Sequence, residues 1–259
     1  MSTPDLPPEI LDYIIENFHD RPETLKRCCQ LSKLWILCTR KHLFADIRFR
    51  TEKYLKLWSE TFPDPSMSSA RYAKGLFVDF SRDITAGEEG GSWIRGFSRV
   101  VCLVVVADRS FSFIPSHGFS PVLKSLRFTV PVPPPSRTTN LILSFPLLED
   151  LAITIYYERS ADDDSDKLLT VVQPSCPPVF TGSLELHLKG MGPFTRRLLS
   201  LPGGIHFQKL VLTWFHEADR LMTMALVEGC YDTLESLSIS DSSCAFIRHV
   251  STLTTYFYF

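Results

Sequence analysis

Seven short apolar runs recur from residue 75 onward, and their spacing constrains the fold more than any other feature of the chain. The runs span residues 75–80, 101–106, 123–128, 148–153, 184–188, 207–212 and 234–239. Aligning them on Val78, Leu103, Leu126, Leu151, Leu186, Leu210 and Leu237 gives gaps of 25, 23, 25, 35, 24 and 27 residues. A period near 25 residues is typical of repeats that each supply one strand and one returning segment. We therefore expect an α/β fold in which residues 75–259 form an irregular leucine-rich-repeat-like solenoid with parallel strands.

The repeats are irregular in three respects. The pattern apolar-x-x-Leu-x-apolar holds in only four runs, and the chain has only two asparagines, so other groups must satisfy the backbone at the bends. The best return helix is 217–230, with Leu221, Met222, Ala225 and Leu226 expected on its packed face. The 35-residue gap holds an acidic loop at 162–166, which is best explained as an insertion. It also holds the short run Val171-Val172, a candidate for an extra strand.

The segment 254–259 ends in four aromatic residues. It indicates either a closing strand or a repeat domain that continues past it, because solenoids usually finish with a polar capping repeat. We expect a short or truncated array. Before the repeats, residues 50–74 are predicted to be a linker helix and loop, in which Tyr54, Leu55, Leu57, Trp58 and Phe62 precede Pro63.

The first 49 residues carry three helix signals. Pro7 and Pro8 stand in a first turn, where a missing N–H costs nothing, and an apolar stripe follows at Ile10, Leu11, Ile14, Ile15 and Phe18. A second helix, expected to carry Leu25, Cys28, Cys29 and Leu31, is predicted to start at Asp20 as N-cap, with Glu23 three residues later. Ser32 is predicted to cap the third helix. Three helices of about 10 residues cannot bury all their apolar faces among themselves, so residues 1–49 are interpreted as a docking module.

The residues of this segment resemble an F-box. The resemblance is carried by Leu6-Pro7-Pro8-Glu9-Ile10-Leu11, Ile14, Leu25, Cys28, Leu31-Ser32-Lys33-Leu34-Trp35 and His42-Leu43-Phe44. The continuation through residues 40–49 is similar to the F-box-like proteins abundant in mushroom-forming fungi. The whole arrangement resembles the leucine-rich-repeat class of F-box proteins.

The resemblance implies a substrate-recognition adaptor of a ubiquitin ligase, not an enzyme. The N-terminal helices would bind the SKP adaptor subunit of a cullin–RING ligase, and the repeats would present a target protein. The residues expected to bind the SKP subunit are Leu6, Pro7, Pro8, Ile10, Leu11, Ile14, Leu31, Trp35, Leu43 and Phe44. Some of them must also form the module's own core.

Two other interpretations stay open at this stage. The chain could be an interaction scaffold that binds no ligase and packs its F-box-like helices on its own repeats. Leu6, Pro7 and Ile10 would then be covered in the folded chain. It could also be an α/β enzyme, which requires a compact sheet around a pocket with paired polar groups.

Composition limits the remaining classes of function. The net charge of −2 argues against a nucleic-acid partner, although residues 21–60 carry ten Lys/Arg against four Asp/Glu and could steer an acidic protein. Seven scattered cysteines, an acidic N-terminus and no apolar run longer than 100–107 predict a cytoplasmic or nuclear protein without a membrane partner.

No cofactor, metal or catalytic residue is expected. Cys28, Cys29, Cys38 and His42 lack zinc-ligand spacing, and the acidic loop lacks the glycine and final glutamate of a calcium loop. His216-Glu217 is the best catalytic candidate, but a glutamate at a helix start is favoured by the helix dipole alone.

Overall fold

The computed structural model describes residues 6–64, 69–80, 96–107, 119–130, 142–155, 180–187, 192–201, 203–214, 217–241 and 255–258. The helices are α1 (Pro8–Glu16), α2 (Pro22–Cys28), α3 (Lys33–Leu43), α4 (Glu52–Thr61), α6 (Gly192–Leu199) and α7 (Glu217–Gly229), with a 3-10 turn, η1 (Ser69–Tyr72). The strands are β1 (Asp46–Phe49), β2 (Gly75–Phe80), β3 (Cys102–Ala107), β4 (Ser125–Val130), β5 (Asp150–Ile155), β6 (Ser183–His187), β7 (Lys209–Trp214), β8 (Ser236–Asp241) and β9 (Thr255–Tyr258).

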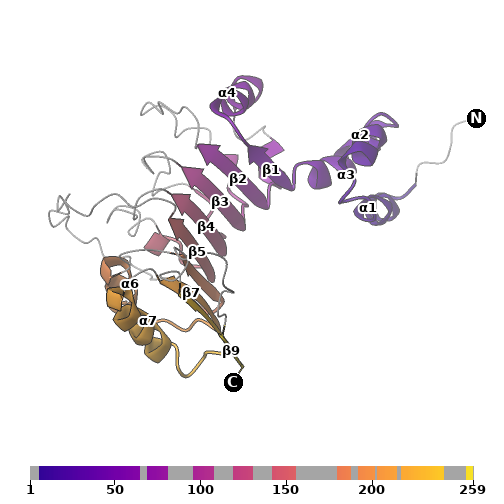
Figure 1. Ribbon diagram of the computed structural model, residues 1–259. Coiled ribbons are helices and arrows are strands. Elements are labelled where there is room, and N and C mark those ends of the chain that lie inside the picture. The colour runs from indigo at the N-terminus through magenta and orange to yellow at the C-terminus, as the bar shows by residue number, and fades with distance from the viewer. Residues whose placement is uncertain are drawn as a thin grey trace, which may run out of the picture.

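The nine strands form one open sheet in chain order (Figure 1). Strands β1 to β8 are parallel, and β9 pairs antiparallel with β8. The helices α1, α2 and α3 lie beyond the β1 end, whereas α6 and α7 lie side by side towards the other end (Figure 1). The expected α/β class with parallel strands is confirmed.

The sheet begins earlier than predicted. Residues 46–49, which the sequence analysis placed in the helical module, form strand β1, and its Ile47 pairs with Leu76 of β2. Ile47 and Phe49 are buried, whereas Asp46 and Arg48, which alternate with them, are exposed. This period-2 alternation is the signature of a strand with one packed face. The helical module therefore ends at α3.

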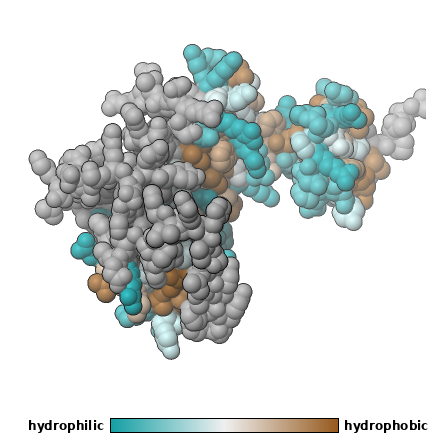
Figure 2. Space-filling model, viewed as in Figure 1, coloured by the Kyte–Doolittle hydropathy of each residue, from teal (hydrophilic) through white to brown (hydrophobic). Residues whose placement is uncertain are grey.

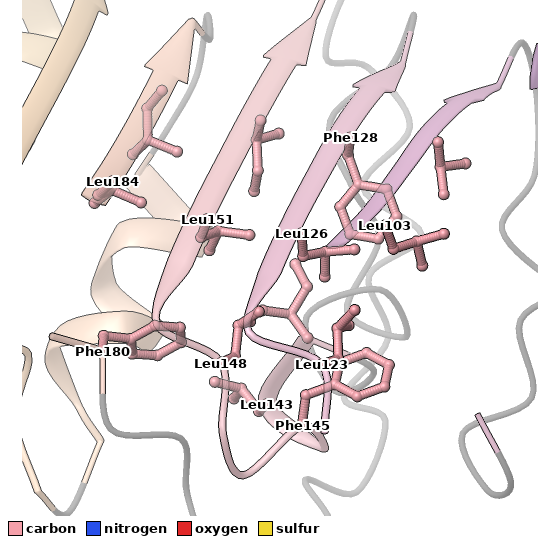
Figure 3. Close-up of a cluster of buried hydrophobic side chains, with 14 of the residues drawn as sticks. Leu103, Leu123, Leu126, Phe128, Leu143, Phe145, Leu148, Leu151, Phe180 and Leu184 are labelled. Carbon is pink, nitrogen blue, oxygen red and sulfur yellow. The ribbon is translucent and has the colours of Figure 1, made fainter. Parts of the chain in front are cut away.

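The core is built on a row of equivalent side chains, one from each parallel strand. The strand register aligns Ile47, Leu76, Leu103, Leu126, Leu151, Leu184, Leu210 and Leu237. All eight are buried, and Figure 3 shows four of them stacked at the same height on one face of the sheet. The predicted alignment was correct at five strands and wrong at two, where Leu76 replaces Val78 and Leu184 replaces Leu186. Both members of each pair face the core, so the apolar pattern alone cannot separate them.

Backbone groups at the bend before each strand form a regular ladder. One carbonyl oxygen in each bend accepts two N–H groups of the next repeat, at 2.7–3.2 Å. The accepting residues are Ala45, Lys74, Val101, Lys124, Gly182 and Gln208. In the described bends, main-chain carbonyls therefore satisfy these backbone N–H groups, a role for which the chain's two asparagines are too few.

The ladder is irregular between β5 and β6, where the Glu149 carbonyl accepts only the Gly182 N–H. There Asp150 Oδ1 accepts both the backbone N–H and the hydroxyl of Ser183, each at 2.7 Å. A Cβ on Gly182 would collide with the Asp150 carboxylate, so only glycine lets the two repeats approach this closely. The acidic loop and Val171-Val172 of this long connection lie outside the described residues.

Three helix details differ from prediction. The N-cap of α2 is Arg21 rather than Asp20, because Pro22 takes the first helical position. Helix α2 ends at Cys28, which leaves Leu31 in the turn that follows. Leu226 of α7 is buried as predicted, but Leu221 is 70% exposed, and Thr223, which was not predicted, is buried on the packed face. Ser32 does cap α3, since its Oγ accepts the Trp35 N–H at 3.5 Å.

Candidate binding surfaces

The helical module has a small core of its own. Leu11 and Ile15 of α1, Leu25 of α2 and Cys38 of α3 are buried together, separately from the sheet core. Phe18, Leu34, Trp35 and Leu43 pack partly buried around them. Because this core is already filled by the inward faces of three helices, apolar side chains on the outward faces have no use within the module.

An ion pair joins the first and third helices. Lys41 Nζ lies 2.9 Å from Asp12 Oδ2. The hydrogen bond from Lys41 lowers the pKa of the Asp12 carboxyl, and the same bond raises the pKa of Lys41. Burial, and the neighbouring Asp12, raise the pKa of the Cys38 thiol. This thiol therefore stays protonated at neutral pH and acts as a core side chain.

The ten residues predicted to bind a partner fall into three groups. Leu6, Pro7, Pro8, Ile10 and Leu31 are exposed; Leu6 is 44%, Ile10 48% and Leu31 64% exposed. Figure 2 shows apolar surface on the module over α1, among hydrophilic neighbours. Ile14, Trp35, Leu43 and Phe44 are half-buried. Leu11 is 1% exposed and belongs to the module's own core, the second role expected of some of these ten residues. Tyr13 and Leu37, which were not predicted, are also exposed apolar residues of the module.

An aromatic cluster connects the helical module to the sheet. Phe44, the C-cap of α3, packs against the sheet core and makes an edge contact with Trp58 of α4, with ring centroids 6.2 Å apart. Trp58 also contacts Phe49 of β1, Phe97 and Phe62. We call these five rings the junction cluster. Since its members come from α3, β1, α4 and the segment before β3, the cluster restrains the helical module relative to the sheet.

The face of the sheet opposite the leucine row carries polar side chains that meet across four strands. Arg127 of β4 donates from Nη2 to Glu185 Oε2 of β6, at 3.1 Å. It crosses β5 at Ala152, its register partner, whose methyl group leaves room for the guanidinium to pass. His187 Nε2 lies 2.9 Å from the other Glu185 oxygen. We call Arg127, Glu185, His187, Thr213 and Ser240 the outward network.

The chemistry of the donors and acceptors fixes which group donates each hydrogen bond in this network. A carboxylate only accepts, so His187 Nε2 carries a proton towards Glu185. In the neutral ring, Nδ1 then accepts the hydroxyl of Thr213, 2.9 Å away, and Thr213 accepts that of Ser240, 2.7 Å away. Both oxygens of Glu185 are engaged, and the network presents little free negative charge.

Sequence reasoning missed the outward network. Arg127 and Glu185 are 58 residues apart and meet only because the register places them on the same row. The usable signal was the position between the two inward residues of each run, read across the repeats. His216, which the sequence offered as a catalytic candidate and which was set aside, lies outside the described residues, as does the side chain of Glu217. Within the described ranges there is no cluster of His, Cys, Asp and Glu suited to a metal.

Comparisons with known proteins place the chain in no family. No family model, curated protein or solved structure matches it. Among the residues that the structure describes, every helix is too short or too polar to cross a bilayer. The geometry of the two surfaces is therefore the basis for a functional conclusion.

Proposed function

We propose that the chain is a substrate-recognition adaptor of a SKP–cullin–RING ubiquitin ligase, with the N-terminal helices as an F-box-like module. In this proposal the module binds the SKP subunit, and the irregular leucine-rich-repeat-like sheet binds a target protein. The mechanism is proximity, because a target held on the adaptor has a high effective concentration beside the conjugating enzyme.

The observation that carries the proposal is the exposure of apolar side chains on a module whose core is already full. Leu6, Ile10, Tyr13 and Leu31 are exposed although they are apolar, and Figure 2 shows apolar surface over α1, of the kind that marks protein interfaces. The scaffold interpretation required Leu6, Pro7 and Ile10 to be covered by the repeats, and all three are exposed.

The open sheet favours an adaptor over an enzyme. Its strands follow one another in chain order, and the outward network lies on an extended face instead of converging on one reacting atom. Such a face suits the binding of a polypeptide.

Co-purification of the full chain with a SKP adaptor subunit tests the proposal. Pro8→Glu and Ile10→Glu place charge in the exposed patch, where glutamate is compatible with a helix first turn. We expect Ile10→Glu to weaken binding at least tenfold, since burying an aliphatic side chain contributes roughly 1.5–3 kcal/mol. The control is Leu221→Glu, an apolar position on α7 that is 70% exposed against 48% for Ile10. Unchanged retention of the Pro8 and Ile10 variants, with a wild-type helical signal by circular dichroism, would refute the docking assignment.

A further inference from the structure

We propose that the sheet recognises an extended segment of its target that carries two acidic side chains about four residues apart, with an apolar side chain between them. The segment crosses the strands from β1 to β4 on the face opposite the leucine row. This inference rests on the proposed function, because it names the chemistry of the target that the sheet would present.

The contact surface is one register row of the outward face. The row runs through Arg48, Phe77, Val104, Arg127, Ala152, Glu185, Val211 and Ser238. We call it the outward row. Its first four positions read basic, aromatic, aliphatic, basic. Arg48 is exposed, and none of the ion pairs among the described residues includes it. Phe77 and Val104 are half-buried and form an apolar floor between the two arginines.

The spacing of the row sets the spacing in the target. Neighbouring strands lie about 4.8 Å apart, so Arg48 and Arg127, three strands apart, are separated by roughly 14 Å. An extended peptide advances about 3.4 Å per residue. Two carboxylates that pair with these arginines therefore belong to residues about four positions apart. Side chains of a strand alternate, so the middle residue of the five points to the same side as the acidic pair and meets Phe77 and Val104.

The charges of the face favour carboxylates at these two points. Arg127 gives one guanidinium N–H to Glu185 and remains 57% exposed, which leaves other donors of its planar fork for a partner. Glu185 is neutralised by Arg127 and bonded by His187, so it repels an incoming acid only weakly. The neighbouring row on the same face carries Asp79, which is half-buried and already has an interaction partner. Its carboxylate disfavours further acidic groups on that row, so the acidic side chains of the target are expected on the row of Arg48.

A peptide fits this surface better than a nucleic acid does. A polyanionic backbone would use the arginines but leave the apolar floor without a partner, and Phe77 is the only aromatic residue of the outward row for a base to stack on. The whole chain carries a net charge of −2, which opposes general polyanion binding.

Selection from a displayed library of random 12-residue peptides on the immobilised full chain tests the inference. We expect enriched sequences to carry Asp or Glu at positions i and i+4 and Leu, Ile, Val or Phe at i+2. Arg48→Gln should remove the enrichment at one acidic position and Arg127→Gln at the other, while Arg27→Gln on exposed α2 leaves both unchanged. Enrichment that persists in the Arg48 and Arg127 variants overturns the inference, as does selection of acidic residues with no apolar preference.

A double-mutant cycle with one selected peptide then assigns each contact. Each arginine variant, and each Asp→Asn or Glu→Gln change in the peptide, should weaken binding about 2- to 5-fold at low salt, the range of an exposed ion pair. The combined change should cost no more than either alone. Full competition by a poly-glutamate peptide of the same length would contradict the inference. Because none of these measurements uses the SKP subunit, failure here is distinguishable from failure of the docking proposal.

Discussion

Replacing Asp150 with alanine is predicted to destabilise the sheet at the bend before β6, where a side chain substitutes for a backbone carbonyl as hydrogen-bond acceptor. Asp150 Oδ1 accepts two hydrogen bonds from Ser183, both 2.7 Å long. Hydrogen bonds to charged groups contribute roughly 1.5–3 kcal/mol each. Asp150 and Ser183 are only half-buried, so water replaces part of the loss. We expect Asp150→Ala to lower the free energy of unfolding by about 2–3 kcal/mol.

Three further variants separate the contributions at this bend. Asp150→Asn keeps a carbonyl acceptor and should cost about 1 kcal/mol or less, whereas Ser183→Ala removes only the hydroxyl bond and should cost about 1 kcal/mol. Glu149→Ala is the matched control, because it removes the adjacent carboxylate, whose ion pair with Lys124 is exposed. It should cost less than about 1 kcal/mol.

Urea unfolding followed by circular dichroism measures these differences, and hydrogen exchange at residues 180–187 localises them. We expect the Ser183 amide to exchange faster in Asp150→Ala and to stay protected in Asp150→Asn. The reasoning is wrong if the free energy of unfolding of Asp150→Ala differs from that of the native chain by less than about 0.5 kcal/mol, roughly the error of such measurements. It is also wrong if Asp150→Asn is as damaging as Asp150→Ala, because an amide oxygen can accept the same bonds.

The remaining predictions concern the junction cluster, the helical module and the thiols. Trp58→Ala should cost roughly 2–3 kcal/mol, less than a fully buried tryptophan, and should loosen the helical module from the sheet; Trp58→Phe should retain most of both properties, as measured by unfolding and by limited proteolysis between the two parts. The ion pair of Asp12 and Lys41 stabilises the module at pH values above the ordinary carboxyl pKa of 3.8, and this contribution should be lost as the pH falls through the depressed pKa of Asp12; an Asp12→Asn variant should show a smaller loss of α-helical signal between pH 5 and pH 3 than the native chain. Exposed Cys102 should be alkylated by iodoacetamide long before Cys230, whose thiol has a pKa raised by burial, and equal rates in the folded chain would contradict the described burial.

The elements were predictable because their signals are local. Apolar residues two positions apart indicate each strand. Prolines, an N-cap serine and a 3.6-residue period indicate the helices. The same local signals misplaced β1, since four residues between two helices were assigned to the longer helical pattern around them. The alternation of buried Ile47 and Phe49 with exposed Asp46 and Arg48 is present in the sequence, but the first strand was predicted only from residue 75 onward.

The division of the apolar stripe of α1 between exposed and core residues was not predictable from periodicity. Ile10 and Leu11 are adjacent in sequence and belong to the same apolar stripe, yet Ile10 is 48% exposed and Leu11 is 1% exposed. The five apolar residues of this stripe cover more of the α1 surface than its contact with two neighbouring helices can bury. The packing angle of α1 on α3 decides which of these side chains stay exposed.

The amino-acid sequence by itself determined that this chain forms short parallel strands with a period near 25 residues behind a three-helix segment, because each strand needs only its own apolar alternation. The tertiary structure alone decided the register, the repair of the bend by Asp150, and the row that places Arg48, Phe77, Val104 and Arg127 side by side. These features depend on contacts between residues 23 or more positions apart, which the apolar alternation of a single strand does not specify.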